Sequence, residues 1–166
     1  TTPNSRLLRN DGGKFADVTD ALASGLRTTG MVTGALWSDI DADGWLDLLV
    51  THEWGPVAVW KNAKGKLANA STEAGTADLL GWWTGIAASD LDEDGDMDYA
   101  VGNLGLNTKY HASRGKPYLA YFGDLDGSGV PRFVEACHEG NSLFPVRGKS
   151  CSTHAIPSLG KKFSTF

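Results

Sequence analysis

Several features are scarce or missing in this chain of 166 residues. Lysine and arginine together number 15 against 20 aspartates and glutamates, so the net charge is −5 and no basic surface is available for nucleic acid. No apolar run approaches the roughly 20 residues that a membrane-spanning helix needs. The first residues show neither an initiating Met nor a signal-peptide profile. We therefore expect a soluble segment excised from a longer chain, with no nucleic-acid partner and no membrane insertion.

Cysteines are few, and the common catalytic motifs are missing. The two cysteines, Cys137 and Cys151, both lie near the C-terminus. A disulfide between them would stabilise an exported protein by roughly 3 kcal/mol, whereas two unpaired thiols fit the sequence equally well. No Gly-x-Ser-x-Gly elbow, P-loop or His-Glu-x-x-His motif is present, so the sequence offers no support for catalysis.

Glycine, in contrast, is abundant, with 21 residues in the chain. This share is well above the ordinary usage of about 7%, and it indicates many tight turns and hence short strands. Hydrophobic residues make up 41% and aromatic residues 10%, which is enough for a packed core. We expect an all-β protein.

An internal repeat organises the sequence. Residues 30–53 align without gaps on residues 81–104, with a period of 51. Each unit reads as four short strands joined by polar turns. In the clearest unit the strands are expected at 34–40, 46–51, 57–61 and 66–70. Four-stranded units that recur about every 40 to 50 residues are typical of β-propeller blades, with a solenoid as the alternative.

We expect the chain to form a single propeller segment, 1–166, which the repeat period divides into four parts. These are a half blade 1–29, a blade 30–80, a shortened blade 81–116 and a blade 117–166. The third part is shortened because the next aspartate cluster starts early, so 103–116 should be mostly loop and a new strand should start near Tyr118. About three four-stranded antiparallel blades make a partial propeller, because a ring closes with about four or more. The remaining blades would come from a longer chain or from a homo-oligomer.

The strongest chemical signal is the loop Asp-x-Asp-x-Asp-Gly-x-x-Asp, which occurs at 39–47 (the first loop) and at 90–98 (the second loop). Its carboxylates are Asp39, Asp41, Asp43 and Asp47, and then Asp90, Asp92, Asp94 and Asp98. Carboxylates at alternate positions of a tight loop converge, and we expect the backbone carbonyls of Trp45 and Asp96 to add one ligand to each set. Oxygen ligands select a hard cation, and this flexible arrangement suits Ca²⁺ better than Mg²⁺.

Two other interpretations of these loops compete with a calcium site. An EF-hand would need a glutamate where the chain has Val50 and Val101, and it would need flanking helices. Alternatively, the aspartates and glycines serve only to form turns.

A third loop, at 124–132, departs from the pattern. Asp124, Asp126 and Ser128 are its candidate ligands, but Arg132 stands where the last aspartate should be. Either the arginine replaces the metal as the counter-charge, or it points away and the site is weak.

The aspartate loops, the preceding Thr-Gly-x-x-x-x-Ser-Asp strands and the hairpin at 9–19 resemble FG-GAP/VCBS repeats, the blades of integrin-α-like propellers. Residues 102–108, 116–126, 144–147 and 161–163 are similar to bacterial exported VCBS proteins that are often joined to an ASPIC/UnbV domain. The resemblance implies a calcium-stabilised propeller that is secreted, periplasmic or at the cell surface. It also implies a role in adhesion or recognition, with a protein or glycan ligand. Arg132 departs from the family, which usually has aspartate there.

Two functional classes stay open on these grounds. The first is a non-catalytic calcium-binding module for extracellular recognition or adhesion. The second is part of a propeller enzyme that acts on polysaccharide, for which the candidate residues are His52, Glu53, Tyr110 and His111.

Three tryptophans, Trp54, Trp82 and Trp83, fall outside the expected strand cores and near loop ends. They either stack on sugar rings or, as we favour, fill the packing between blades.

Overall fold

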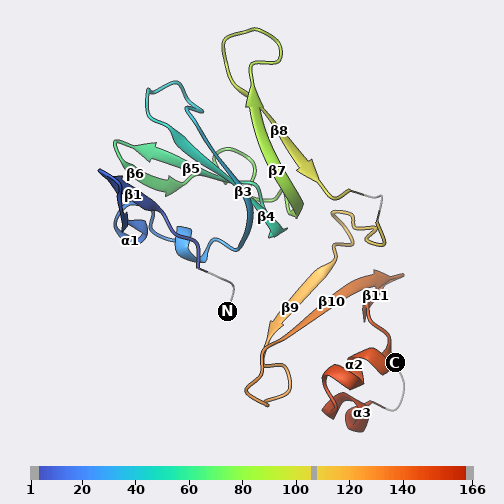
Figure 1. Cartoon of the computed structure of the whole chain (residues 1–166). Helices are drawn as coiled ribbons and strands as arrows, with labels where there is room; N and C mark the ends of the chain where they lie inside the picture. Colours follow the sequence, from blue (N-terminus) through green and yellow to red (C-terminus); the bar gives the residue numbers. More distant parts are fainter. Residues whose placement is uncertain (1–3, 106–107, 164–166) are drawn as a thin grey trace. The chain divides into compact units, whose positions relative to one another are not determined.

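The computed structural model describes residues 4–105 and 108–163, which belong to two compact units (Figure 1). Within these ranges the helices are short, the longest having 7 residues, and the named strands pair in antiparallel fashion. The predicted all-β fold class is confirmed. No described helix has the length and apolar character needed to cross a membrane.

The first unit is built on a four-stranded meander in which each strand pairs with the next. Its strands are β3 (Met31–Ser38), β4 (Asp47–Gly55), β5 (Ala58–Ala63) and β6 (Lys66–Asn69). Each overlaps one of the strands expected for the clearest repeat, with ends displaced by at most four residues. Most apolar residues of the central strands β4 and β5 are buried, which explains why these strands could be recognised in the sequence.

A hairpin and two short helical turns precede the meander. They are β1 (Leu8–Asp11), β2 (Lys14–Asp17), α1 (Thr19–Leu22) and the 3₁₀ helix η1 (Leu26–Thr28). Ala23 and Leu26 pack with Trp60 and Leu67 of the meander in one buried cluster. The segment of the helical turns and the meander therefore share a core.

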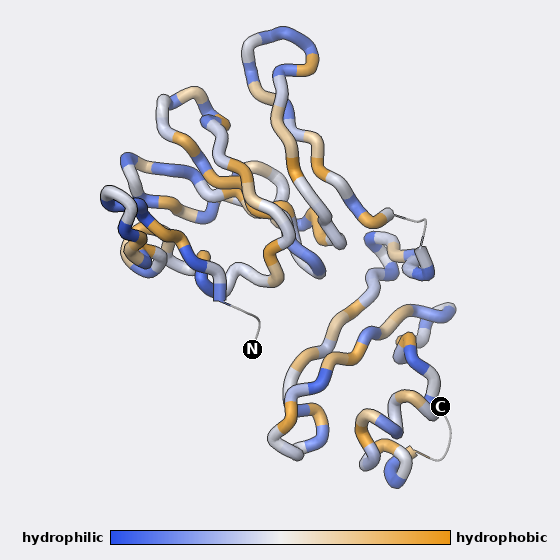
Figure 2. Tube along the Cα trace, in the orientation of Figure 1, coloured by the Kyte–Doolittle hydropathy of each residue, from blue (hydrophilic) through white to orange (hydrophobic). Residues whose placement is uncertain are grey.

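A second hairpin, β7 (Gly81–Ser89) and β8 (Asp98–Asn103), joins the far end of β4. The contact is a short antiparallel pairing in which Glu53 lies opposite Trp82. The tube is hydrophilic along the turn that joins β7 to β8 (Figure 2). This turn is the second aspartate loop.

The second unit contains β9 (Leu119–Gly123), β10 (Arg132–Glu139), β11 (Ser142–Pro145), α2 (Lys149–Ala155) and α3 (Ser158–Lys162). Strand β9 begins one residue after the expected start near Tyr118. The described residues between β8 and β9 form a loop with one isolated bridge, Ser113 to Lys116, as expected. The helices α2 and α3 have no counterpart among the expected elements. Both cysteines are free thiols, Cys137 half-buried and Cys151 exposed.

The prediction that three tryptophans fall outside the strands is wrong. Trp54 lies in β4, and Trp82 and Trp83 lie in β7, each near the end of its strand. The rings of Trp54 and Trp82 are 5.9 Å apart between centroids, and Nε1 of Trp83 donates to the carbonyl of Leu79 at 2.9 Å. The strands are longer than expected because the tail of β4 pairs with the start of β3 and with β7, and the tryptophans lie near the junction of β4 and β7.

Candidate metal centre

The three aspartate loops occupy equivalent places in the fold. The first joins β3 to β4, the second joins β7 to β8, and the third joins β9 to β10. In each loop the last position of the nine-residue motif is the first residue of the following strand: Asp47, Asp98 and Arg132. Three related local sequences therefore form turns at equivalent places in the fold.

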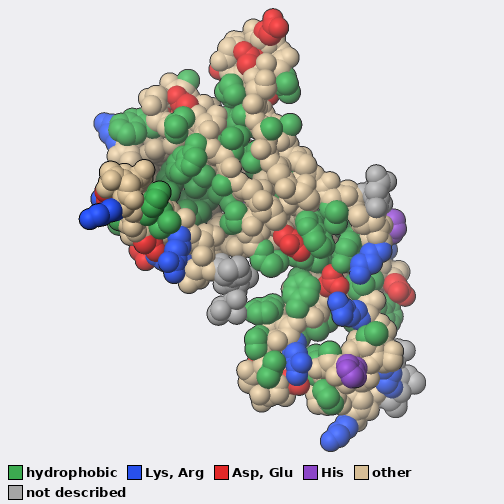
Figure 3. Space-filling model, in the orientation of Figure 1, with side chains coloured by type: hydrophobic (Ala, Val, Ile, Leu, Met, Phe, Trp, Pro, Cys, Tyr) green, Lys and Arg blue, Asp and Glu red, His purple; other side chains and the backbone are tan. Residues whose placement is uncertain are grey.

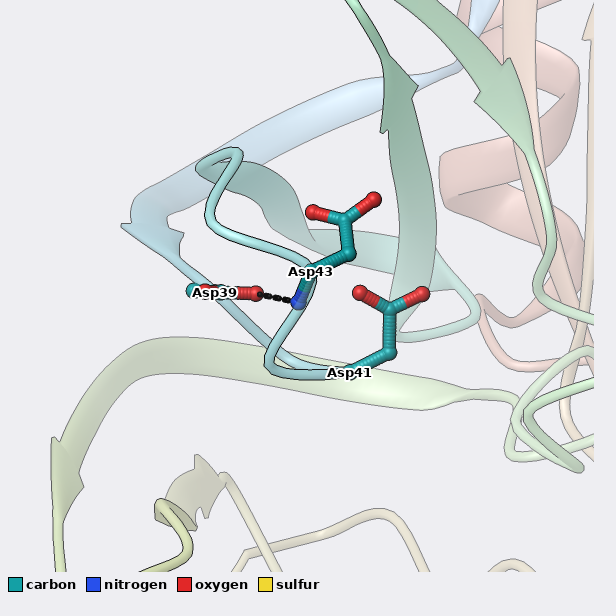
Figure 4. A group of neighbouring side chains, drawn as sticks. All are labelled: Asp39, Asp41 and Asp43. Carbon is teal, nitrogen blue, oxygen red and sulfur yellow. Dashed lines mark hydrogen bonds between the residues drawn. The ribbon is translucent and has the colours of Figure 1, made fainter.

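In the first loop the structure brings together Asp39, Asp41 and Asp43, whose carboxylate oxygens lie within 4.8 Å of one another (Figure 4). Oδ1 of Asp39 accepts a hydrogen bond from the backbone N–H of Asp43 at 3.1 Å, and Oδ2 accepts from Gly44 at 2.9 Å. The φ of Gly44 is +87°, a conformation that glycine adopts without strain. The loop is thus closed around the side chain of its own first residue.

Asp47 is not part of this group of three. Its side chain is buried, and its two oxygens accept backbone hydrogen bonds from Ile40 at 2.9 Å and from Asn62 at 2.7 Å. Asp47 therefore ties the end of the first loop to β5. Its role as a metal ligand stays a prediction.

The second loop assembles a different set, in which Asp90, Asp92 and Asp98 have oxygens within 4.8 Å of one another. Oδ2 of Asp98 accepts from the N–H of Leu91 at 2.9 Å, as Asp47 does from Ile40 in the first loop. Oδ2 of Asp90 accepts from Gly95 at 3.0 Å. Asp94 lies outside the group and accepts from the N–H of Asp96 at 2.9 Å. Acidic side chains gather at the tip of this turn (Figure 3).

One atom of the second loop lacks the partner that its burial requires. Oδ1 of Asp90 is buried and has no hydrogen-bond partner within the described structure. A buried carboxylate oxygen without a donor is unfavourable unless a cation neutralises it. The three carboxylates offer only hard oxygen donors, so the residues present fit a calcium ion.

The two residues predicted to contribute carbonyl ligands, Trp45 and Asp96, are exposed. The N–H of Trp45 donates to Asp43 at 2.8 Å, and the N–H of Asp96 donates to Asp94 at 2.9 Å. These matching bonds shape the two loops alike. The assignment of their carbonyls as ligands stays a prediction.

The third loop keeps the turn but has fewer charges. Oδ1 and Oδ2 of Asp124 accept from the backbone of Ser128 at 3.0 Å and of Gly129 at 2.8 Å, as Asp39 does in the first loop. The hydrogen bond from the Ser128 side chain lowers the pKa of Asp126, and the charge of Arg132 adds to this effect. Nε of Arg132 is itself buried without a hydrogen-bond partner in the described structure. With two carboxylates and one arginine, this loop is the least suited to a cation.

The side chain of Lys61, which the sequence did not identify as a site residue, contacts the first loop. Nζ of Lys61, on β5, lies 3.0 Å from Oδ2 of Asp41. The hydrogen bond to this carboxylate raises the pKa of Lys61. The sequence contains a weak indication of this contact. Arg9 of the hairpin at 9–19 aligns with Lys61, so a basic residue recurs at this position of the repeat.

The first and second loops lie side by side in the first unit. A cleft of about 330 Å³ separates them, and its lining includes Asp39 and Asp41 from one loop and Asp96 from the other. The cleft is acidic, so calcium bound at either loop would lower the negative charge of its walls.

The residues nominated for a polysaccharide-degrading enzyme are divided between the two units. His52 is buried in β4, with Nδ1 2.7 Å from the carbonyl oxygen of Pro56 and Nε2 3.0 Å from the hydroxyl of Thr29. Glu53 is half-buried in the same strand, whereas Tyr110 and the exposed His111 belong to the other unit. The hydrogen bond to Glu135 raises the pKa of Tyr110 to about 12, so this phenol stays protonated at neutral pH.

Residues 39–101 match the family model of the FG-GAP-like repeat. The matched segment runs from the first aspartate of the first loop into β8 and contains both three-carboxylate groups. The third loop lies beyond it. The resemblance to FG-GAP repeats is thereby confirmed for this segment, while a VCBS or ASPIC/UnbV association stays a prediction. No curated protein and no solved structure matches the chain.

Proposed function

We propose that this chain is part of a calcium-binding β-propeller of the extracellular type. Its role would be non-catalytic recognition or adhesion, with a protein or glycan as ligand. The observation that carries the proposal is the pair of three-carboxylate groups at equivalent turns of an FG-GAP-like repeat. FG-GAP-like repeats are typical of extracellular proteins, which agrees with a secreted, periplasmic or cell-surface location.

Calcium would act here on stability. When bound, the ion supplies positive charge and oxygen coordination without redox chemistry. Asp39, Asp41 and Asp43 would hold one ion, and Asp90, Asp92 and Asp98 would hold another. Without a cation the carboxylates of each group repel one another at these short distances. Neutralising them would keep each turn closed and hold its two strands at a fixed spacing, which would position the exposed loops for a ligand.

The experiment is an isothermal titration of the full chain with Ca²⁺ after chelator treatment. We expect dissociation constants of about 10⁻⁴ to 10⁻³ M, the range of extracellular modules. The variant Asp92→Asn should abolish binding at the second loop, because it removes one of only three clustered carboxylates. Asp78→Asn, an exposed aspartate outside the loops, is the matched control and should bind as the unsubstituted chain does. Absence of any calcium heat would refute the proposal.

A further inference from the structure

The first loop contains a cation that belongs to the protein itself. The ammonium group of Lys61 lies 3.0 Å from Oδ2 of Asp41. Asp41 is a member of the group whose carboxylate oxygens lie within 4.8 Å of one another. We propose that Lys61 is the built-in counter-ion of the first loop, that it competes with Ca²⁺ for Asp41, and that the second loop therefore fills at lower calcium concentrations. This inference rests on the proposed function of both loops as calcium sites.

The second loop provides the contrast. Its three clustered carboxylates, Asp90, Asp92 and Asp98, form no ion pair with a lysine or arginine of the described residues. Oδ1 of Asp90 is in addition buried without a hydrogen-bond partner. In this loop an incoming cation meets uncompensated charge, whereas in the first loop it meets charge that is already partly neutralised.

The side chain of Lys61 can act as a removable counter-ion because of its position. It extends from β5 with 43% of the side chain exposed, and Asp41 is 35% exposed. The ammonium can therefore swing into water when a divalent ion takes its place, without leaving a buried charge behind. Asn62, the next residue along β5, stays bonded to Asp47 through its backbone, so the strand itself need not move.

The size of the competition follows from Coulomb's law. Even after Lys61 swings away from Asp41, a dication and an ammonium about 6 Å apart in a solvent-like dielectric repel each other enough to weaken binding by about tenfold. The chain would then respond to calcium in two stages, with the second loop occupied first. In the calcium-free state the same lysine reduces the repulsion among Asp39, Asp41 and Asp43, so the first loop should keep its shape.

The test measures calcium affinity at each loop separately in the full chain. In the background Asp92→Asn, which leaves the first loop as the stronger site, the substitution Lys61→Met should lower the dissociation constant of the first loop about tenfold. Lys66→Met is the matched control, because Lys66 is exposed on the same hairpin and makes no ion pair within the described structure. We expect Lys66→Met to change the constant less than about twofold. Lys61→Arg keeps the positive charge and should keep the weak binding.

A second readout does not depend on calcium. In the presence of EDTA, Lys61→Met should lower the melting temperature relative to Lys66→Met, because the three carboxylates lose their counter-ion. Equal affinities of the two loops in the unsubstituted chain, or a first-loop affinity that Lys61→Met leaves unchanged, would overturn the inference while the calcium sites stand. If no variant binds calcium at either loop, the proposed function fails together with the inference.

Discussion

At the scale of single residues, the strongest shift in acid–base behaviour lies away from the aspartate loops. The hydroxyl of Tyr110 donates to Oε1 of Glu135 at 2.5 Å, and its ring meets the ring of Tyr118 edge-on at 5.1 Å. The hydrogen bond stabilises the protonated phenol, and ionisation would place two negative charges together. The pKa of Tyr110 is raised to about 12 as a result.

This shift predicts a loss of stability in alkali. Because the folded pKa of Tyr110 is above the ordinary value of about 10, the interaction contributes fully below pH 10 and is lost as the pH rises toward 12. Tyrosinate absorbance titrations of the unsubstituted chain and of Tyr110→Phe should differ by one late-titrating phenol. The substitution Glu135→Gln should bring that phenol back toward pH 10. If Tyr110 ionises together with the other tyrosines, the hydrogen bond does not form in solution.

At the scale of elements, the tail of β4 is closely packed around His52. A Cβ added at Gly55 would lie 2.9 Å from Cβ of His52, and one added at Gly30 would lie 3.2 Å from the His52 ring. His52 cannot move aside easily, since both ring nitrogens have partners from different segments, Thr29 and Pro56. The two glycines therefore allow a buried histidine at the junction of β4 and β7.

We accordingly expect Gly55→Ala to lower the free energy of unfolding by about 1 to 3 kcal/mol, the usual effect of overpacking. The matched control is Gly85→Ala in β7, where an added Cβ has no neighbour within 4 Å, and it should change stability by less than about 0.5 kcal/mol. Urea denaturation of the two variants measures the difference. Equal stabilities would show that the tail of β4 relaxes around the extra methyl group.

The same strand shows how far the sequence could predict the fold. The strands β3 to β6 follow from short apolar runs bounded by Asp-Gly and Lys-Gly turns, which are local signals. The last residues of β4 could not be predicted, because they become a strand by pairing with the start of β3 and with β7. The helices α2 and α3 are too short to show a helical period.

The candidate site could likewise be predicted only in part from the sequence. The repeat itself predicted the convergence of carboxylates in the first and second loops, since the spacing is a local property. The different members, Asp43 in one loop and Asp98 in the other, could not be predicted from two identical motifs. The backbone N–H of Asn62 donates to Asp47, which lies outside the carboxylate group, and Lys61 of the same strand pairs with Asp41. Both differences between the loops therefore depend on β5. Tertiary neighbours therefore distinguish the two loops.

At the scale of the whole molecule, the two units contain aspartate loops of different composition. The unit of residues 4–105 holds the two loops with three clustered carboxylates, and the unit of residues 108–163 holds the loop with Arg132. A ligand that binds only the folded state stabilises the unit that carries its site. The two units should therefore respond differently to calcium.

Differential scanning calorimetry with Ca²⁺ and with EDTA tests this expectation. At a hundredfold excess over the dissociation constant, each occupied loop should stabilise the first unit by about 2.7 kcal/mol. The transition of the second unit should shift much less. If the thermograms with calcium and with EDTA superimpose, the aspartate loops act as turns only.

The tryptophan pair at the junction of β4 and β7 also gives the protein an optical signature. Trp54 and Trp82 come from the two strands, and their indole planes are inclined by 40° at a centroid distance of 5.9 Å. Two chromophores that are close and not parallel couple their electronic transitions, which splits the indole band into a positive and a negative circular-dichroism component. The couplet should exist only while β4 and β7 remain paired. Its amplitude is thus a label-free spectroscopic measure of whether β4 and β7 of the FG-GAP-like segment remain paired. The couplet should be lost in Trp54→Phe.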